Sequence, residues 1–183
     1  MTAKIVLLNG VGSAGKSSIA KALQAITAEP FLHVAMDAFL EMLPEALQEN
    51  MPGFAYEAGS ESGKPSVVIE AGPVGRRLMQ GMRHAIAAMA RQGNNLIVDD
   101  VMVGGEMAHY QALLGDFEVF RVGVFAPLAV LEAREGARAD RSPGLARWQF
   151  ERVHDGMRYD LEVDTSLLSV QECALRIQRQ FRL

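Results

Sequence analysis

Short runs of apolar residues alternate along the chain with longer segments in which apolar positions recur every three or four residues. A short apolar run predicts a strand buried on both faces, and the longer spacing predicts an amphipathic helix. The expected strands are 5–8, 31–36, 96–100, 119–125 and 159–163. The expected helices are 17–26, 38–47, 76–91, 127–137 and a terminal helix opened by a capping box at 169–172. This alternation predicts an α/β domain with a mostly parallel sheet.

The stretch 48–75 departs from this pattern because glycine and proline become frequent and no period persists. Such a composition predicts a long, irregular insertion, of the kind that serves as a lid or binding loop or else is disordered. The chain of 183 residues otherwise fits one domain, so we expect a single domain over 1–183.

Composition excludes several classes of protein. With 49% hydrophobic residues the chain is not disordered, and a net charge of −4 argues against a nucleic-acid binder. The single cysteine, Cys173, excludes an intramolecular disulfide. The first apolar run is too short for a signal peptide. The sequence also contains no run of about eighteen apolar residues, which is the length needed to span a membrane. We therefore expect a cytoplasmic protein without a membrane partner, and a homo-oligomer remains open.

The most specific motif follows the first expected strand, where residues 10–17 read G-V-G-S-A-G-K-S and match G-x4-G-K-[ST]. Glycines let successive N–H groups point inward around an anion, and the following helix adds its positive N-terminal end. A glycine-rich turn that binds nothing is the alternative. The pattern and its strand–helix context predict a nucleoside triphosphate site, with nucleotide-binding residues Gly10, Val11, Gly12, Ser13, Ala14, Gly15, Lys16, Ser17 and Ser18.

Two aspartates end the third expected strand, Asp99 and Asp100. In P-loop proteins a carboxylate in this position lies near the metal, so we expect Mg²⁺ to be held by Ser17 and Asp99. The sequence leaves open which aspartate faces the metal, and a solvated strand end is the alternative.

A GTPase motif of the form N/T-K-x-D is absent, which favours a small kinase. A hydroxyl kinase needs a carboxylate at the end of the second strand, and Asp37 directly follows 31–36. We expect Asp37 to be the general base. The alternative is that Asp37 is only the N-cap of a helix starting at Ala38.

A kinase also needs cationic groups that stabilise the transferring phosphoryl group, and guanidinium groups suit this purpose. The segment 134–146 carries arginines into a Pro-Gly turn and is the expected lid, with Arg138 and Arg141 as its catalytic residues beside Lys16. Solvated Arg–Asp pairs are the alternative interpretation.

Taken together, these residues resemble the chloramphenicol phosphotransferases, small P-loop kinases related in fold to shikimate and adenylate kinases. The resemblance lies in matching segments that span nearly the whole chain in the family's order: 5–17, 34–37, 97–101 with the glycines 104–105, 134–141 and 153–165. The last two segments are much more specific than the P-loop alone.

This resemblance implies a three-layer P-loop NTPase fold with helices on both faces of a five-stranded parallel sheet, in the order 2-3-1-4-5. It also implies transfer of the ATP γ-phosphate to a hydroxyl of a small molecule, with Arg138 and Arg141 contacting the nucleotide. Residues 48–77 match poorly and carry Arg76 and Arg77, so we expect this insertion to determine the acceptor. A shikimate- or adenylylsulfate-type metabolite kinase and a nucleotide-binding regulatory module are the alternatives.

Overall fold

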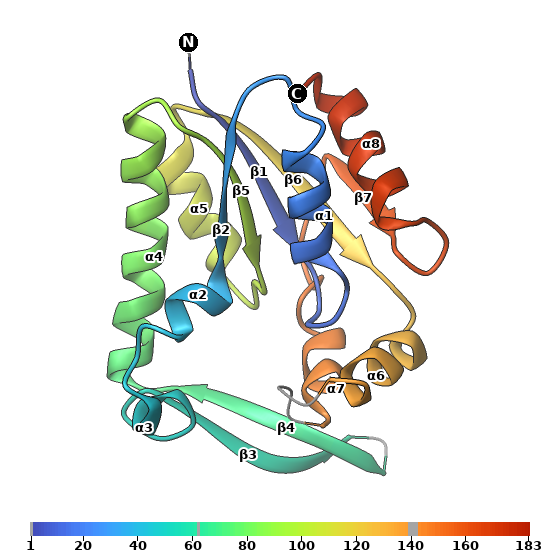
Figure 1. Ribbon diagram of the computed structural model, residues 1–183. Coiled ribbons are helices and arrows are strands. Elements are labelled where there is room, and N and C mark those ends of the chain that lie inside the picture. Colours follow the sequence, from blue (N-terminus) through green and yellow to red (C-terminus); the bar gives the residue numbers. More distant parts are fainter. Residues whose placement is uncertain (1, 62, 139–142) are drawn as a thin grey trace.

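A five-stranded parallel sheet forms the centre of the molecule (Figure 1). The computed structural model describes residues 2–61, 63–138 and 143–183. The spatial order of the strands is β2-β5-β1-β6-β7, which confirms the expected order 2-3-1-4-5 when the sheet strands are numbered along the chain. Their bounds are β1 Lys4–Asn9, β2 Phe31–Ala35, β5 Asn95–Asp100, β6 Glu118–Phe125 and β7 Leu161–Asp164.

Helices cover both faces of this sheet (Figure 1). Both faces of β1 are buried, which explains its unbroken apolar run. Val6 and Leu8 join the core cluster on one face of the sheet, and Ile5 and Leu7 join the cluster on the other face. The helices are α1 Lys16–Gln24, α2 Met36–Leu40, α3 Glu45–Gln48, α4 Pro73–Arg91, α5 Glu106–Leu114, α6 Leu128–Gly136, α7 Leu145–Phe150 and α8 Val170–Phe181. No helix within the described ranges is long and apolar enough to cross a membrane.

The insertion is more regular than its composition predicted. Instead of an irregular loop, it contains α3 and an antiparallel hairpin of β3 (Phe54–Glu61) and β4 (Lys64–Ala71). The prediction of irregular structure was wrong because Gly59 and Pro65 lie inside these strands, where a two-stranded ribbon tolerates them.

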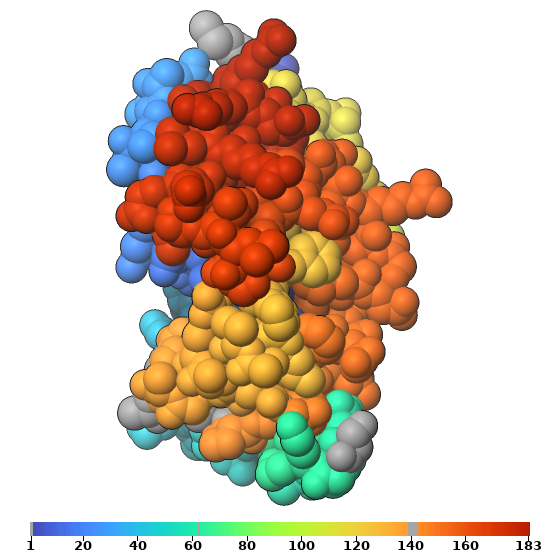
Figure 2. Space-filling model, turned by 90° about the vertical axis from the view of Figure 1, so that its right-hand side faces the viewer, coloured from blue at the N-terminus to red at the C-terminus, as the bar shows by residue number. Residues whose placement is uncertain are grey.

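The hairpin is held at its base and again in its outer half. At its base, the N–H of Gly72 donates to the carbonyl of Gly53 (2.7 Å), and a Cβ atom on Gly72 would lie 2.3 Å from the carbonyl oxygen of Pro52. Toward its tip, the N–H of Val67 donates to the carbonyl of Gly144 just before α7 (3.3 Å). Figure 2 shows the green tip of the hairpin at the lower edge of the face that also presents α6 and α8.

Other differences from the predicted elements have local causes. The expected helix 38–47 is two short helices, α2 and α3, because Pro44 lies between them. The last strand begins at Leu161 rather than Tyr159. The sequence pattern did not predict α5 or α7, whereas the capping box of Ser169 and Glu172 opens α8 as expected.

Candidate active site

The P-loop connects β1 to α1 at the carboxyl end of the sheet. Gly15 lies in the left-handed region (φ 93°), as does Ser13 (φ 64°), so the loop folds back on itself before α1 begins. Gly10 packs so closely that a Cβ atom there would lie 2.4 Å from the carbonyl oxygen of Val124. The loop therefore has the tight curvature that an anion-binding nest requires.

Lys16 is buried at the centre of this loop. Its Nζ atom donates to the carbonyl oxygens of Gly10 (2.9 Å) and Val11 (3.1 Å) and lies 3.7 Å from a carboxylate oxygen of Asp99. The ammonium group is thus held over the loop, where it can contact phosphate oxygens.

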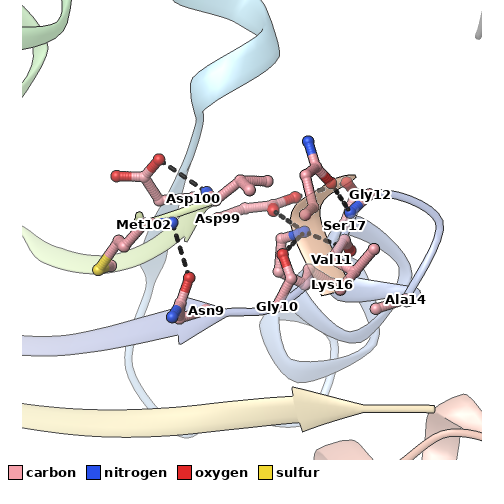
Figure 3. Close-up of polar contacts among 12 residues, drawn as sticks. Asn9, Gly10, Val11, Gly12, Ala14, Lys16, Ser17, Asp99, Asp100 and Met102 are labelled. Atoms are coloured by element: carbon pink, nitrogen blue, oxygen red, sulfur yellow. Dashed lines mark hydrogen bonds and ion pairs between the residues drawn. The ribbon is translucent and has the colours of Figure 1, made fainter. Parts of the chain in front are cut away.

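Asp99 and Asp100 point to different sides of β5 (Figure 3). Asp99 accepts a hydrogen bond from the Ser17 hydroxyl (2.5 Å), whereas Asp100 accepts from the Tyr110 hydroxyl (2.8 Å) beneath α5. Burial and the nearby Glu106 raise the pKa of Asp100 to about 6. Asp99 is therefore the aspartate that faces the P-loop.

The environment of Asp99 keeps it ionised. Burial raises its pKa, but contacts with His33, Lys16 and Ser17 outweigh burial, and the pKa lies below its usual range. A charged carboxylate beside a hydroxyl oxygen is the hard-oxygen donor set that Mg²⁺ prefers, with phosphate and water oxygens completing its shell. Ser17 and Asp99 accordingly fit the expected metal.

Asp37 lies on α2, between two cavities. Its helix starts at Met36 with Ala35 as N-cap, and no side chain caps it, so the interpretation of Asp37 as the N-cap of a helix starting at Ala38 is wrong. Asp37 is half-buried and lines both cavities.

The first cavity, here called the phosphate cavity, has a volume of about 390 Å³. Residues of the P-loop, the first turn of α1, the end of β5 and the lid line it, among them Ser13, Lys16, Ser17, Ser18, Asp99 and Arg138. The second, here called the apolar cavity, has a volume of about 370 Å³. Its walls include the ring or aliphatic side chains of Leu40, Phe54, Tyr56, Ile69, Met79 and Trp148. The two cavities share Met36, Asp37, Val101 and Gln149.

The expected lid forms one side of the phosphate cavity. Arg138 lines this cavity, whereas Arg141 lies outside the described residues. Arg134 also lines it and donates to the hydroxyl and carbonyl oxygens of Thr165 (2.9 Å each). Glu135, the next residue, is buried. Its carboxylate accepts hydrogen bonds from the backbone N–H groups of Gly144 (2.8 Å) and Ala146 (2.7 Å), at the other end of the lid.

The segment 153–165 supports the P-loop from behind. The Asn9 amide at the end of β1 donates to the Tyr159 hydroxyl (2.8 Å), and the Thr165 hydroxyl donates to the carbonyl of Ala14 (2.9 Å). Burial and the charge of Lys16 lower the pKa of His154 to about 4, and this ring stacks on Phe125. His154 is therefore neutral near pH 7.

The two arginines of the insertion differ in position. Arg76 lines the apolar cavity and donates to the carbonyl of Ala71, whereas Arg77 is exposed outside it. Sequence reasoning missed two other residues of the site. His33 on β2 lies 3.6 Å from Asp99, and Gln149 reaches the P-loop from α7. No local signal marks either residue, because each reaches the site only through its distant partner in the fold.

Comparison with known proteins matches the chain to one family model, described as chloramphenicol phosphotransferase-like protein, over residues 3–182. Proteins from two strains of Mycobacterium tuberculosis, provisionally named O-phosphotransferases, are 30% identical over 185 residues, covering 98% of this chain and 82% of theirs.

Similar solved structures have P-loop kinase folds. An unliganded sugar kinase from Janibacter has a TM-score of 0.69 at 17% identity, covering 100% of this chain and 95% of that one. The APS kinase CysC of M. tuberculosis, solved with AMPPNP and APS, has a TM-score of 0.66 at 17% identity. This match covers 100% of this chain and 99% of that one. The tunicamycin resistance protein of Deinococcus radiodurans has a TM-score of 0.62 at 20% identity, and the match covers 99% of this chain and 96% of that one.

Proposed function

We propose that this chain, which belongs to the chloramphenicol phosphotransferase-like family, transfers the γ-phosphate of ATP to a hydroxyl group of a small organic molecule. Family membership supports phosphotransfer as the general activity. The observation that carries the finer proposal is the position of Asp37, which lies where the phosphate cavity and the apolar cavity meet.

The phosphate cavity suits the donor nucleotide. Backbone N–H groups of the P-loop and the N-terminus of α1 would surround the phosphates, and Lys16 would contact their charge. Ser17 and Asp99 would hold Mg²⁺, which supplies neutralisation of phosphate charge when bound. Arg138, on the lid side of the same cavity, would stabilise the charge that spreads over the transferring oxygens.

The apolar cavity suits the acceptor. Its aromatic walls would hold a small organic molecule with one hydroxyl group directed at Asp37. The hydroxyl oxygen forms a bond to the γ-phosphorus, its proton passes to the Asp37 carboxylate, and the bond to the β–γ bridging oxygen breaks, so that ADP leaves. We place the reaction in the cytoplasm, with neither a nucleic acid nor a membrane as partner, and a homo-oligomer remains open.

The test is an acceptor panel with ATP and Mg²⁺, in which chloramphenicol, shikimate-like alcohols and sugars are examined by mass spectrometry for a phosphate adduct. An adduct on chloramphenicol or on another alcohol identifies the acceptor. Release of phosphate only to water, or no turnover at all, would contradict a hydroxyl kinase and favour the regulatory module.

The matched variant for this test is Asp37→Asn, which keeps the shape of the side chain and removes the proton acceptor. We expect kcat with the best acceptor to fall about 10²–10⁴-fold. Because the carboxylate lies in the first turn of α2, loss of its charge should cost thermal stability no more than about 1 kcal/mol. Asp116→Asn, an exposed change outside both cavities, is the control. Near-normal transfer by Asp37→Asn would remove the general base from the proposal.

A further inference from the structure

We infer that Gln149 is a further catalytic residue, whose side-chain amide is anchored on the P-loop by its oxygen and donates a hydrogen bond from its nitrogen to the transferring phosphoryl group. The inference rests on the proposed function, because it assigns a role at the point where the phosphate passes to the acceptor. Gln149 belongs to α7, outside the P-loop and the expected lid 134–146.

The anchoring contact is short and buried. Gln149 is 4% exposed, and its Oε1 atom lies 2.7 Å from the backbone nitrogen of Gly12. Since a backbone N–H can only donate, the atom facing it must be the amide oxygen, which fixes the orientation of the whole planar group. A Cβ atom at position 12 would lie 3.1 Å from this oxygen, so glycine leaves the room for the contact.

The position of Gln149 coincides with the expected route of the phosphoryl group. It lines both cavities, together with Asp37, Met36 and Val101. Any group that moves from the nucleotide to an alcohol in the apolar cavity must cross this shared boundary. In the proposed reaction, a side chain at this boundary would face the γ-phosphoryl group, because this is the phosphate that passes to the acceptor.

The amide nitrogen is available for that contact. Among the described residues, none accepts a hydrogen bond from Nε2, and this atom is not among the enclosed polar atoms that lack a partner. Nε2 is therefore not fully enclosed, and the residue that carries it lines both cavities. An N–H donor aimed at oxygens whose charge changes during transfer stabilises the transition state more than the bound nucleotide.

The helix that carries Gln149 also forms a wall of the acceptor site. Leu145 and Trp148 of α7 line the apolar cavity, and Glu135 holds the first turn of this helix. An acceptor seated against Trp148 thus contacts the same short helix that positions the amide. The placement of Gln149 is set by the P-loop at one side and by α7 at the other.

The test compares Gln149→Met, which has similar length and no polar atoms, with Gln111→Met, the same change on the exposed surface of α5. Turnover of ATP is measured with chloramphenicol as acceptor and with water alone, and ADP affinity is measured by calorimetry. We expect Gln149→Met to lower kcat at saturating ATP at least tenfold. ADP affinity should stay within about threefold of wild type, because ADP lacks the γ-phosphoryl group. The control should match wild type.

A second variant separates donation from anchoring. Gln149→Glu keeps an oxygen that can accept from Gly12 but replaces the donor by a carboxylate oxygen, so kcat should fall at least as far as in Gln149→Met. Its activity relative to wild type should recover as pH falls, because a protonated carboxyl group regains a donor. Full activity of the Glu variant at neutral pH would show that anchoring on Gly12 is all that is required of this side chain.

The outcomes distinguish this inference from the function on which it rests. If the wild type turns over ATP, Lys16→Ala does not, and Gln149→Met retains wild-type kcat, only the role of Gln149 is overturned. Full activity of Gln149→Glu at neutral pH also overturns it. If the wild type transfers phosphate to none of the alcohols in the acceptor panel, the proposed function fails and the inference fails with it.

Discussion

Glu135 on α6 is expected to be the main support of α7. Its carboxylate, 5% exposed, accepts from the N–H groups of Gly144 and Ala146, and α7 begins between them. The N-cap residue, Gly144, has no side chain that could accept hydrogen bonds from the first N–H groups of this helix. Replacement by alanine removes both acceptors and leaves donors at the start of a helix that forms part of both cavities.

The size of the effect follows from these contacts. A hydrogen bond to a charged group contributes about 1.5–3 kcal/mol. Water can replace the carboxylate at half-buried Gly144 but not at fully buried Ala146, so we take the lower end of the summed range, about 3 kcal/mol. At roughly 2–4 °C per kcal/mol for a chain of this size, Glu135→Ala should lower Tm by about 6–12 °C. Glu135→Gln keeps one oxygen and loses the charge, so about half of this loss is expected.

The assay combines thermal unfolding with hydrogen exchange of the peptide that contains α7. The second measurement matters because the loss can appear as local opening of α7 before the sheet unfolds. Glu151→Ala, an exposed change at the end of the same helix, should shift stability by no more than about 0.5 kcal/mol. Wild-type values of both Tm and α7 exchange in Glu135→Ala would refute the reasoning.

Two further predictions concern the nucleotide. Lys16→Ala should abolish ATP-dependent transfer. Circular dichroism should show an intact fold, because Nζ contacts loop carbonyls and Asp99 rather than the core. Wild-type turnover at saturating ATP would show that the phosphate site is wrongly assigned. Arg138→Ala should lower kcat by about tenfold or more. Arg138→Lys should recover only part of this lost activity, because lysine lacks the planar guanidinium group. Full activity of the alanine variant would show that Arg138 is a surface cation without a role in transfer. Steady-state kinetics measures both effects.

Local sequence was sufficient to predict which residues of the P-loop and of β5 lie together in the phosphate cavity. The P-loop carries its conformation in adjacent residues, and the buried runs that become β1 and β5 determine where Lys16 and Asp99 meet. The position of Asp37 follows from strand order, because the carboxyl ends of neighbouring parallel strands lie at one edge of a sheet.

The apolar cavity, which we propose binds the acceptor, could not be predicted in this way. The hairpin is stabilised by cross-strand pairing and by its contact with Gly144, and neither leaves a period in the sequence. Gln149 meets Gly12 across 137 positions of sequence, through a hydrogen bond that no spacing encodes. Wherever a side chain acquires its role from a distant backbone group, composition and periodicity carry no information about it.

The base of the hairpin has a consequence for how such a protein diversifies. The contacts there join backbone atoms of Gly53, Gly72 and Pro52, and none depends on the inward-facing side chains of β3 and β4. Tyr56 and Ile69 line the apolar cavity and pack against the core beneath α4, so they can be exchanged for side chains that fill the same space while the backbone attachment is kept. Under the proposed function, substitutions in β3 and β4 would therefore change which acceptor fits the apolar cavity without altering the residues of the phosphate cavity.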